Sequence, residues 1–428
     1  MGNFVGLLIR HKRLEQNLSQ QGLCKGICVV SYLSKIEQGL AEPSPEIVQQ
    51  LLSALGVEYT TDPQLMEQGR AFIEDFFERI NYGETEDPDA HAWLERQAQR
   101  LQNSPLYLDH QLYELFRLGR GGFQRPGLPH QRDAFEQAVR ALGPFVPYMS
   151  LTQQFRYYWG ASLDAVSLPQ ALAHLQKAAL LQPCSSILYR IAQAYFAQGQ
   201  YFQAIEQGER AYRAATDEGN LFVMRWVTLM IGSCYSGYPD LELCQRYFQR
   251  ALALARGAHT AIPYLVQYNL GASYVERCRY DEALPHLEEA LRLGENLAES
   301  LPDEVDEGDR LLTLHKLALA YGGVGQVQKA RQACCQAEAL LAGCPGLPPV
   351  CGDMIRLARM RLEPGYLDDA GYAAVLQQVY DTVEQYFAFG FKRFHSFMLI
   401  ELYRHQRRYK EALAISESNL ADFREIAK

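Results

Sequence analysis

Apolar residues recur every three or four positions along almost the entire chain, and no long segment alternates apolar with polar residues. This spacing is typical of amphipathic helices and predicts an all-α protein. In the first sixty residues, Ser19, Gly26, Gly39, Pro45 and Gly56 stand where short helices would begin or end. Four short helices are therefore predicted there, over about 4–14, 20–25, 30–38 and 45–55.

A second pattern, beginning near residue 151, repeats with a period of roughly 34 to 40 residues. Alanine, tyrosine and leucine return in one frame, most clearly between Ile187 and Ala211. The frame is that of the tetratricopeptide repeat, in which small residues let two helices approach closely and stacked pairs bury each other's faces. The pattern predicts a tetratricopeptide-type α-solenoid with a concave groove. Further copies lie at residues 158–183, 231–251, 270–290, 317–337 and 400–412.

The two patterns divide the chain into three predicted parts. Residues 1–60 contain two short helices joined by a tight turn, which is the helix-turn-helix arrangement of DNA-binding domains. Residues 61–150 are helical but match the repeat poorly. Residues 151–428 form the array, which would carry both the groove and a dimer surface.

Composition and charge narrow the functional class. The chain has 428 residues, with 41 Lys and Arg against 50 Asp and Glu, and so a formal charge of −9. Its 48% hydrophobic content excludes a disordered chain, and ten cysteines are too few for a disulfide scaffold. No apolar run of about 18 residues lacks a charge, so we expect a cytoplasmic protein that does not span a membrane. The first sixty residues are neutral, so DNA contact must come from a small local face, doubled in a homodimer.

Residues suited to catalysis or metal binding are not grouped in the sequence. Gly322-Gly323-Val324-Gly325 follows no predicted strand and lacks the Lys-Ser/Thr of a phosphate-binding loop. Cys24 and Cys28 have no histidine nearby, and the four cysteines of residues 334–351 lack the spacing of a zinc site. No set of nucleophile, base and acid is visible. We therefore expect no enzyme, no metal and no cofactor.

The segment from Leu18 to Ser44 resembles the phage-repressor-type helix-turn-helix. It is most similar to the heads of peptide-pheromone-responsive transcriptional regulators of Gram-positive bacteria, the RRNPP family. The matching strings are Leu18-Ser19-Gln20, Ser31-Tyr32-Leu33-Ser34-Lys35-Ile36-Glu37-Gln38-Gly39 and Pro43-Ser44. A tetratricopeptide array behind such a head is the architecture of that family, and the two parts together cover nearly the whole chain.

The resemblance implies roles for individual residues of the head. Gln20 would contact the DNA backbone, and the third helix would lie in the major groove with Ser31, Tyr32, Ser34 and Lys35. Lys35 would contact a phosphate or a guanine. An ion pair between Arg10 and Glu37 would tie the first helix to the third.

The head departs from the family pattern at both ends of the third helix. Val29 and Val30 stand where the family usually has polar or basic residues, and Leu40-Ala41-Glu42 replaces the usual basic residue after Gly39. Val30 would contact a thymine methyl group. An alternative therefore stays open, in which the head is vestigial and the array is a protein-binding scaffold.

The resemblance also implies a short signalling peptide in the groove, held extended by asparagine side chains that both donate to and accept from its backbone. Asn269 lies at a matching position. Arg190 or Lys316 would bind a peptide carboxylate, and aromatic residues would form apolar pockets. The helical spacing places the following candidates on the inward face of the first helix of each pair: Tyr189, Arg190, Gln193, Trp226, Tyr268, Asn269 and Lys316.

The leading interpretation is a homodimeric transcriptional regulator that binds double-stranded DNA under the control of this peptide. Peptide binding would shift the curvature of the array or the dimer geometry, and with it the spacing of the two heads. The aromatic-rich segment from Tyr380 to Tyr409 is a predicted dimer surface, with intra-chain core as the alternative. A regulator of the same build that senses no peptide is a further alternative.

Overall fold

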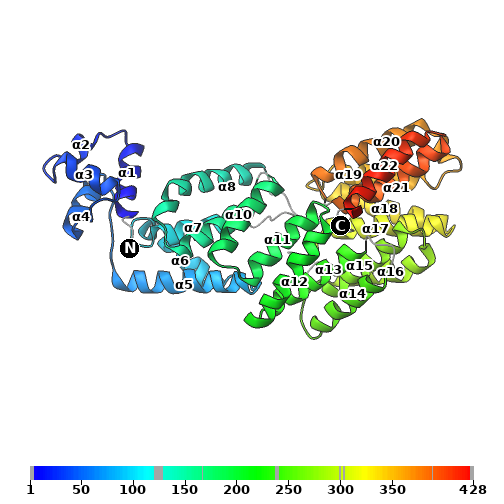
Figure 1. Ribbon diagram of the computed structural model, residues 1–428, viewed down its shortest axis with the longest axis horizontal. Helices are drawn as coiled ribbons and strands as arrows, with labels where there is room; N and C mark the ends of the chain where they lie inside the picture. Colours follow the sequence, from blue (N-terminus) through cyan, green and yellow to red (C-terminus); the bar gives the residue numbers. More distant parts are fainter. Residues whose placement is uncertain are drawn as a thin grey trace. The chain divides into compact units, whose positions relative to one another are not determined.

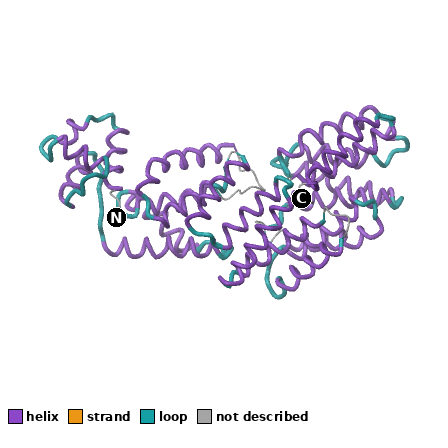
Figure 2. The backbone as a smooth tube through the Cα atoms, viewed as in Figure 1, coloured by secondary structure: helices purple, strands orange, loops and turns teal. Residues whose placement is uncertain are grey.

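The computed structural model describes residues 4–119, 129–165, 167–236, 241–297, 300–301, 304–387 and 389–424. Every regular element within these residues is a helix, which confirms the predicted all-α class (Figure 1). Figure 2 shows the same helices as tubes joined by loops. The chain forms two compact units, residues 1–187 and 188–428, a coarser division than the three parts predicted from the sequence.

The first four helices form the head, residues 4–60. Ser19 and Ser44 cap the second and fourth helices, because their side chains accept hydrogen bonds from the backbone N–H groups of Gly22 and Ile47. Fully buried aliphatic side chains from three of the helices form its core: Ile9, Leu33, Ile36, Leu51 and Leu52. The bounds are α1 (Phe4–Glu15), α2 (Gln20–Cys24), α3 (Val30–Glu37) and α4 (Pro45–Ala54).

Helix α1 passes very close to α3 at Gly6. A Cβ atom at this position would lie 1.8 Å from the carbonyl oxygen of Ile36, which is backbone and cannot rotate away. Only glycine therefore permits this approach. Leu14, at the end of α1 and placed by its spacing on the apolar face, is instead 53% exposed.

The rest of the first unit is a helical stack around an aromatic core. Asp62 and Asp87 cap its first two helices, each followed by proline at the first helical position. Phe76, Phe116 and Trp159 meet edge to face. The elements are α5 (Pro63–Asn81), α6 (Pro88–Gln102), α7 (Tyr107–Leu118), α8 (Pro129–Leu142), the 3-10 helix η1 (Gly143–Tyr148), α9 (Leu151–Ala161) and α10 (Leu168–Leu181).

The second unit consists of successive helix pairs, as the repeat pattern predicts. Alanines between paired helices are fully buried, and a Cβ at Gly271 would lie 2.5 Å from Leu287 on the partner helix. The elements are α11 (Ser185–Ala197, beginning at the end of the first unit), α12 (Tyr201–Glu218), α13 (Leu221–Tyr235), α14 (Glu242–Leu254), α15 (Ile262–Glu276), α16 (Tyr280–Leu297), α17 (Glu307–Gly323), α18 (Val327–Gly343), α19 (Val350–Met360), η2 (Tyr366–Asp368), α20 (Ala370–Thr382), η3 (Val383–Gln385), α21 (Phe389–His405) and α22 (Tyr409–Arg424).

Helix α21 packs against helices far earlier in the sequence. Arg393 forms an ion pair with Glu276 at the end of α15, and Phe394 lies against Lys316 of α17. Phe394, Leu399 and Leu402 are at most 4% exposed within this chain. The aromatic segment 380–409 is therefore largely intra-chain core, which was the alternative to a dimer surface.

Candidate DNA-binding head and peptide groove

Helix α3 presents a polar edge because its apolar side chains point into the head. Leu33 and Ile36 are fully buried, whereas Ser31 and Lys35 are exposed. Val30 is 41% exposed, at the first position of the helix. Val30 and Ser31 are thus available to a ligand at the N-terminal part of α3, where helix-turn-helix proteins contact base edges, and Lys35 is available in the last turn of the helix.

The other predicted contact residues of the head are engaged in hydrogen bonds within it. The Tyr32 hydroxyl donates to the carbonyl of Glu42 over 3.4 Å, and Ser34 accepts from the Gln38 side chain over 3.2 Å. The Gln20 amide donates to Glu37 over 2.8 Å. These side chains therefore hold the geometry of the head as well as lying near its surface.

The predicted ion pair between Arg10 and Glu37 is wrong, because Arg13 is the partner of Glu37. The Arg13 guanidinium makes two bonds to that carboxylate, of 2.6 and 2.8 Å, and also donates to the Leu18 carbonyl. Arg10 lies three residues earlier and is exposed. The Glu37 carboxylate, as hydrogen-bond partner, raises the pKa of Arg13. This bidentate pair joins α1 to α3, the link that was predicted for the neighbouring arginine.

Ion pairing within the head leaves a small set of cations for a ligand. Lys12 pairs with Glu15 over 3.1 Å, and Arg13 is neutralised by Glu37. Among the described residues, Arg10, Lys25 and Lys35 form no ion pair, and all three are exposed. The head therefore offers a few separate positive charges, which suits contact with DNA phosphates only at modest affinity per head.

The predicted groove residues all lie on the first helices of successive pairs. Tyr189, Arg190 and Gln193 are on α11, Trp226 is on α13, Tyr268 and Asn269 are on α15, and Lys316 is on α17. Gln193 donates to the Tyr189 hydroxyl over 2.9 Å, and Tyr268 stacks on Tyr264. The half-buried side chain of Asn269 bonds to none of the described residues, so its amide is free for a ligand backbone.

Lys316 does not face an open groove, because α21 covers it. The side chain is 3% exposed, and its ammonium nitrogen lies 3.0 Å from the centre of the Phe394 ring. Burial lowers the pKa of Lys316 to about 7, although the Glu276 carboxylate acts in the opposite direction. Counting along α17 identified the inward face of the helix but could not show that another helix packs on it.

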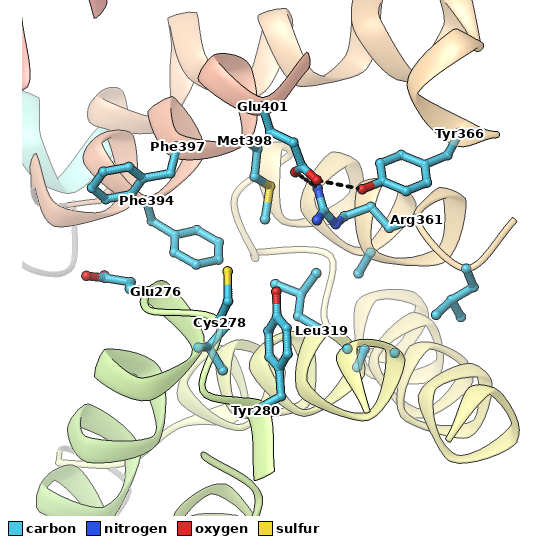
Figure 3. A pocket seen from close by; sticks show the side chains of 16 residues that line it. Glu276, Cys278, Tyr280, Leu319, Arg361, Tyr366, Phe394, Phe397, Met398 and Glu401 are labelled. Carbon is cyan, nitrogen blue, oxygen red and sulfur yellow. Dashed lines mark hydrogen bonds and ion pairs between the residues drawn. The ribbon is translucent and has the colours of Figure 1, made fainter. Parts of the chain in front are cut away.

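A cavity of about 500 Å³ lies between α17 and α21 (Figure 3). Phe394, Phe397 and Met398 of α21 line it on one side, and Leu319 of α17 lies opposite. One end has a network in which Arg361 and Tyr366 both bond to Glu401, over 2.9 and 3.0 Å. These lining residues could not be predicted from the sequence, because they come from widely separated segments of the chain and share no local motif.

Substituting Lys316 with methionine is expected to raise the free energy of unfolding at pH 7 by about 1–4 kcal/mol, since it replaces a buried unpaired charge with an apolar side chain of similar length. The pKa of Lys316 is about 7 in the native chain and about 10.4 in the unfolded chain. Between these two pH values the lysine is protonated more often in the unfolded chain than in the native one. Raising the pH through this range therefore stabilises the wild type. The stability difference should therefore shrink from pH 7 to pH 10. Both proteins keep the neighbouring ionisable groups Glu276, His315, Arg393 and His395, so the comparison isolates the effect of the lysine.

Denaturant unfolding of both proteins at several pH values measures this difference. A constant difference across that range would contradict the prediction.

No group of three or more His, Cys, Asp or Glu side chains suited to a metal ion occurs among the described residues. The ten cysteines are free thiols. In the described part of the chain, no helix is both long enough and apolar enough to cross a bilayer.

Comparison with known proteins bears first on the head. Residues 9–61 match the family model described as helix-turn-helix. The head is a helix-turn-helix domain. A comparison with curated protein sequences gave no match.

Several solved structures are similar to most of the chain. The apo quorum sensor NprR from B. thuringiensis is 15% identical, with a TM-score of 0.58, over 84% of this chain and 98% of that one. A Rap protein complexed with Competence and Sporulation Factor is 15% identical, with a TM-score of 0.64, over 84% of this chain and 99% of that one. NprR in complex with its cognate peptide NprX is 14% identical, with a TM-score of 0.57, over 82% of this chain and 98% of that one. These likenesses, together with the match of the head, confirm the predicted fold, a helix-turn-helix domain followed by an α-solenoid.

Proposed function

We propose that this protein is a DNA-binding transcriptional regulator controlled by a short peptide that binds along the first helices of its array. One observation carries the proposal: a helix-turn-helix head with an exposed edge on α3 stands on the same chain as an α-solenoid of the NprR fold. The structure of NprR with its cognate peptide supports peptide binding by such a solenoid. The free amide of Asn269 suits an extended peptide backbone.

A homodimer is part of this proposal, and the head's electrostatics favour it. Three exposed and unpaired cations in the described head give weak attraction to phosphates, so two heads on one DNA molecule are needed for useful affinity. Peptide binding would change the spacing of the two heads and hence their fit to the two half-sites.

The experiment is enrichment of fragmented source genomic DNA by the full-length protein at low and physiological salt. The wild type should enrich a few roughly palindromic sites. The double substitution Ser31→Ala/Lys35→Ala should weaken binding to them by about tenfold to a hundredfold and flatten the salt dependence. A matched control is Gln328→Ala/Lys329→Ala, which removes one exposed lysine from the second unit and should bind as the wild type does.

One feature favours the scaffold alternative. Val29 and Leu40, which flank α3 on either side, are 67% and 72% exposed, and a partner protein would cover such apolar side chains. In that case the wild type would enrich no discrete site, even with culture filtrate present to supply a peptide. Discrete sites lost in the double substitution would exclude a vestigial head.

A further inference from the structure

Helix α1 is buried on two opposite sides. Gly6, Leu7, Leu8 and Ile9 are four consecutive buried residues, and together they span a full helical turn. Gly6 and Ile9 face α3 and the core of the head. Leu7 and Leu8 point away from that core, yet they are only 8% and 0% exposed. Another part of the chain therefore covers the far side of α1.

The covering residues come from η1 and α7, in the stack of helices from α5 to α10. The ring of His11 meets the ring of Phe145 in η1 edge to face, with the two ring centres 6.2 Å apart. One turn later on α1, the Glu15 carboxylate acts on Tyr107, the first residue of α7, since burial and this charge both raise the pKa of Tyr107. Both contacts lie on the side of α1 that faces away from α3. The head therefore rests on the stack through α1.

The end of α3 and the linker are also held by the stack. A Cβ atom at Gly39, just after α3, would lie 3.0 Å from the ring of Tyr148 in η1. In the linker, the backbone N–H of Thr60 donates to the carbonyl of Asn103 over 2.9 Å. Head and stack belong to one compact unit. The head is thus held at α1, at the end of α3 and at the linker, unlike a domain that hangs on a flexible tether.

The docked head keeps the exposed edge of α3 open. Val30, Ser31 and Lys35 stay exposed although α1 and Gly39 rest on the stack. The contact with η1 therefore does not cover the residues predicted to contact DNA. Its effect is to fix the direction in which α3 points from the first unit.

We propose that His11, Phe145 and Tyr148 are positioning residues, which hold α3 in one orientation so that the protein accepts only one separation of two half-sites on DNA. This inference rests on the proposed function, DNA binding by a homodimer. Each added base pair moves a half-site by about 3.4 Å along the DNA axis and turns it by about 34°. A helix held rigidly cannot follow such a change, whereas a head on a flexible linker can.

The test measures the Kd of the full-length protein for duplexes that differ only in the spacer between the half-sites of an enriched site. The spacer is lengthened and shortened by one, two and five base pairs. The wild type should bind at least about thirtyfold more weakly after a change of two base pairs. Leu7→Ala/His11→Ala/Tyr148→Ala should bind about threefold more weakly at the natural spacer and vary less than about threefold across the others. The two profiles should therefore cross.

Three comparisons separate positioning from damage to the head. The triple variant should bind a duplex with a single half-site as the wild type does, because the edge of α3 is unchanged. Tyr148→Phe keeps the ring against Gly39 and should keep the wild-type spacer profile. A matched control removes the same residue types at exposed positions away from η1, and it should also keep that profile: Leu180→Ala/Tyr82→Ala/His259→Ala.

Four results would overturn the positioning role, and they differ in what else they imply. A wild type that tolerates a change of two base pairs, or a triple variant that is weaker by the same factor at every spacer, would leave DNA binding standing. Tighter binding of a single half-site by the triple variant would mean that η1 masks the head. Enrichment of no discrete site by the wild type would count against the proposed function itself, and this inference would fail with it.

Discussion

Replacing Glu37 with alanine is expected to lower the free energy of unfolding of the head by about 3–5 kcal/mol and to abolish DNA binding. Two donors of Arg13 and the amide of Gln20 converge on the Glu37 carboxylate, and the two charged side chains are only 9% and 2% exposed. Removing the carboxylate leaves a buried guanidinium without its counter-ion. Such a loss costs far more than the loss of a surface pair, which contributes about 0–1 kcal/mol.

Scanning calorimetry of the full chain measures this effect as a shift of the transition that belongs to the head. The matched comparison is between neighbouring arginines on α1. Arg13→Ala should behave like Glu37→Ala, whereas Arg10→Ala should leave the transition almost unchanged, since Arg10 is exposed and unpaired among the described residues. Similar losses from the two arginine substitutions would contradict this account of the head.

Gly6→Ala is expected to destabilise the head by about 3 kcal/mol or more, an unusually large effect for one added methyl group. The new carbon would lie 1.8 Å from the carbonyl oxygen of Ile36, so α1 must move away from α3. That movement would also open the contacts of Ile9 with the core and weaken the Arg13–Glu37 pair. Overpacking against backbone cannot be relieved by a rotamer change.

The control for this substitution is a second helical glycine of the head. A Cβ at Gly22 would have one neighbour within 4 Å, the Ser19 hydroxyl at 3.3 Å. Gly22→Ala should therefore be neutral or slightly stabilising, since alanine favours the helix by about 1 kcal/mol. Urea unfolding followed by circular dichroism compares the two, and an equally small effect at both positions would show that α1 and α3 pack less closely.

Local signals in the sequence were enough to predict the head's helices to within a residue or two. Ser19 begins α2 at Gln20, and α3 runs from Val30 to Glu37, close to the predicted 30–38. The resemblance implied Arg10 as the partner of Glu37, and the helical period alone could not replace it with Arg13, because the phase of α1 depends on its packing at Gly6. Leu14 was misplaced for the same reason.

The array was predictable where small residues keep a fixed spacing. The pairs from α9–α10 to α17–α18, together with α21–α22, coincide with the copies found in the sequence. The pair α19–α20 was missed, since residues 361–369 between its helices break the period. The cavity was not predictable, because Glu276, Arg361 and Glu401 come together only when α21 packs on α15 and α17.

The ion pair between Glu276 and Arg393 joins residues 117 positions apart in the sequence. In an open solenoid each repeat contacts only its neighbours, so the ends can fray while the middle stays folded. Here α21, in the last helix pair, packs against α15 and α17 in the middle of the second unit. The later repeats are therefore held at both ends instead of at one. The helices from α15 to α21 should consequently unfold together, and they should form late in folding because so long a loop must close first.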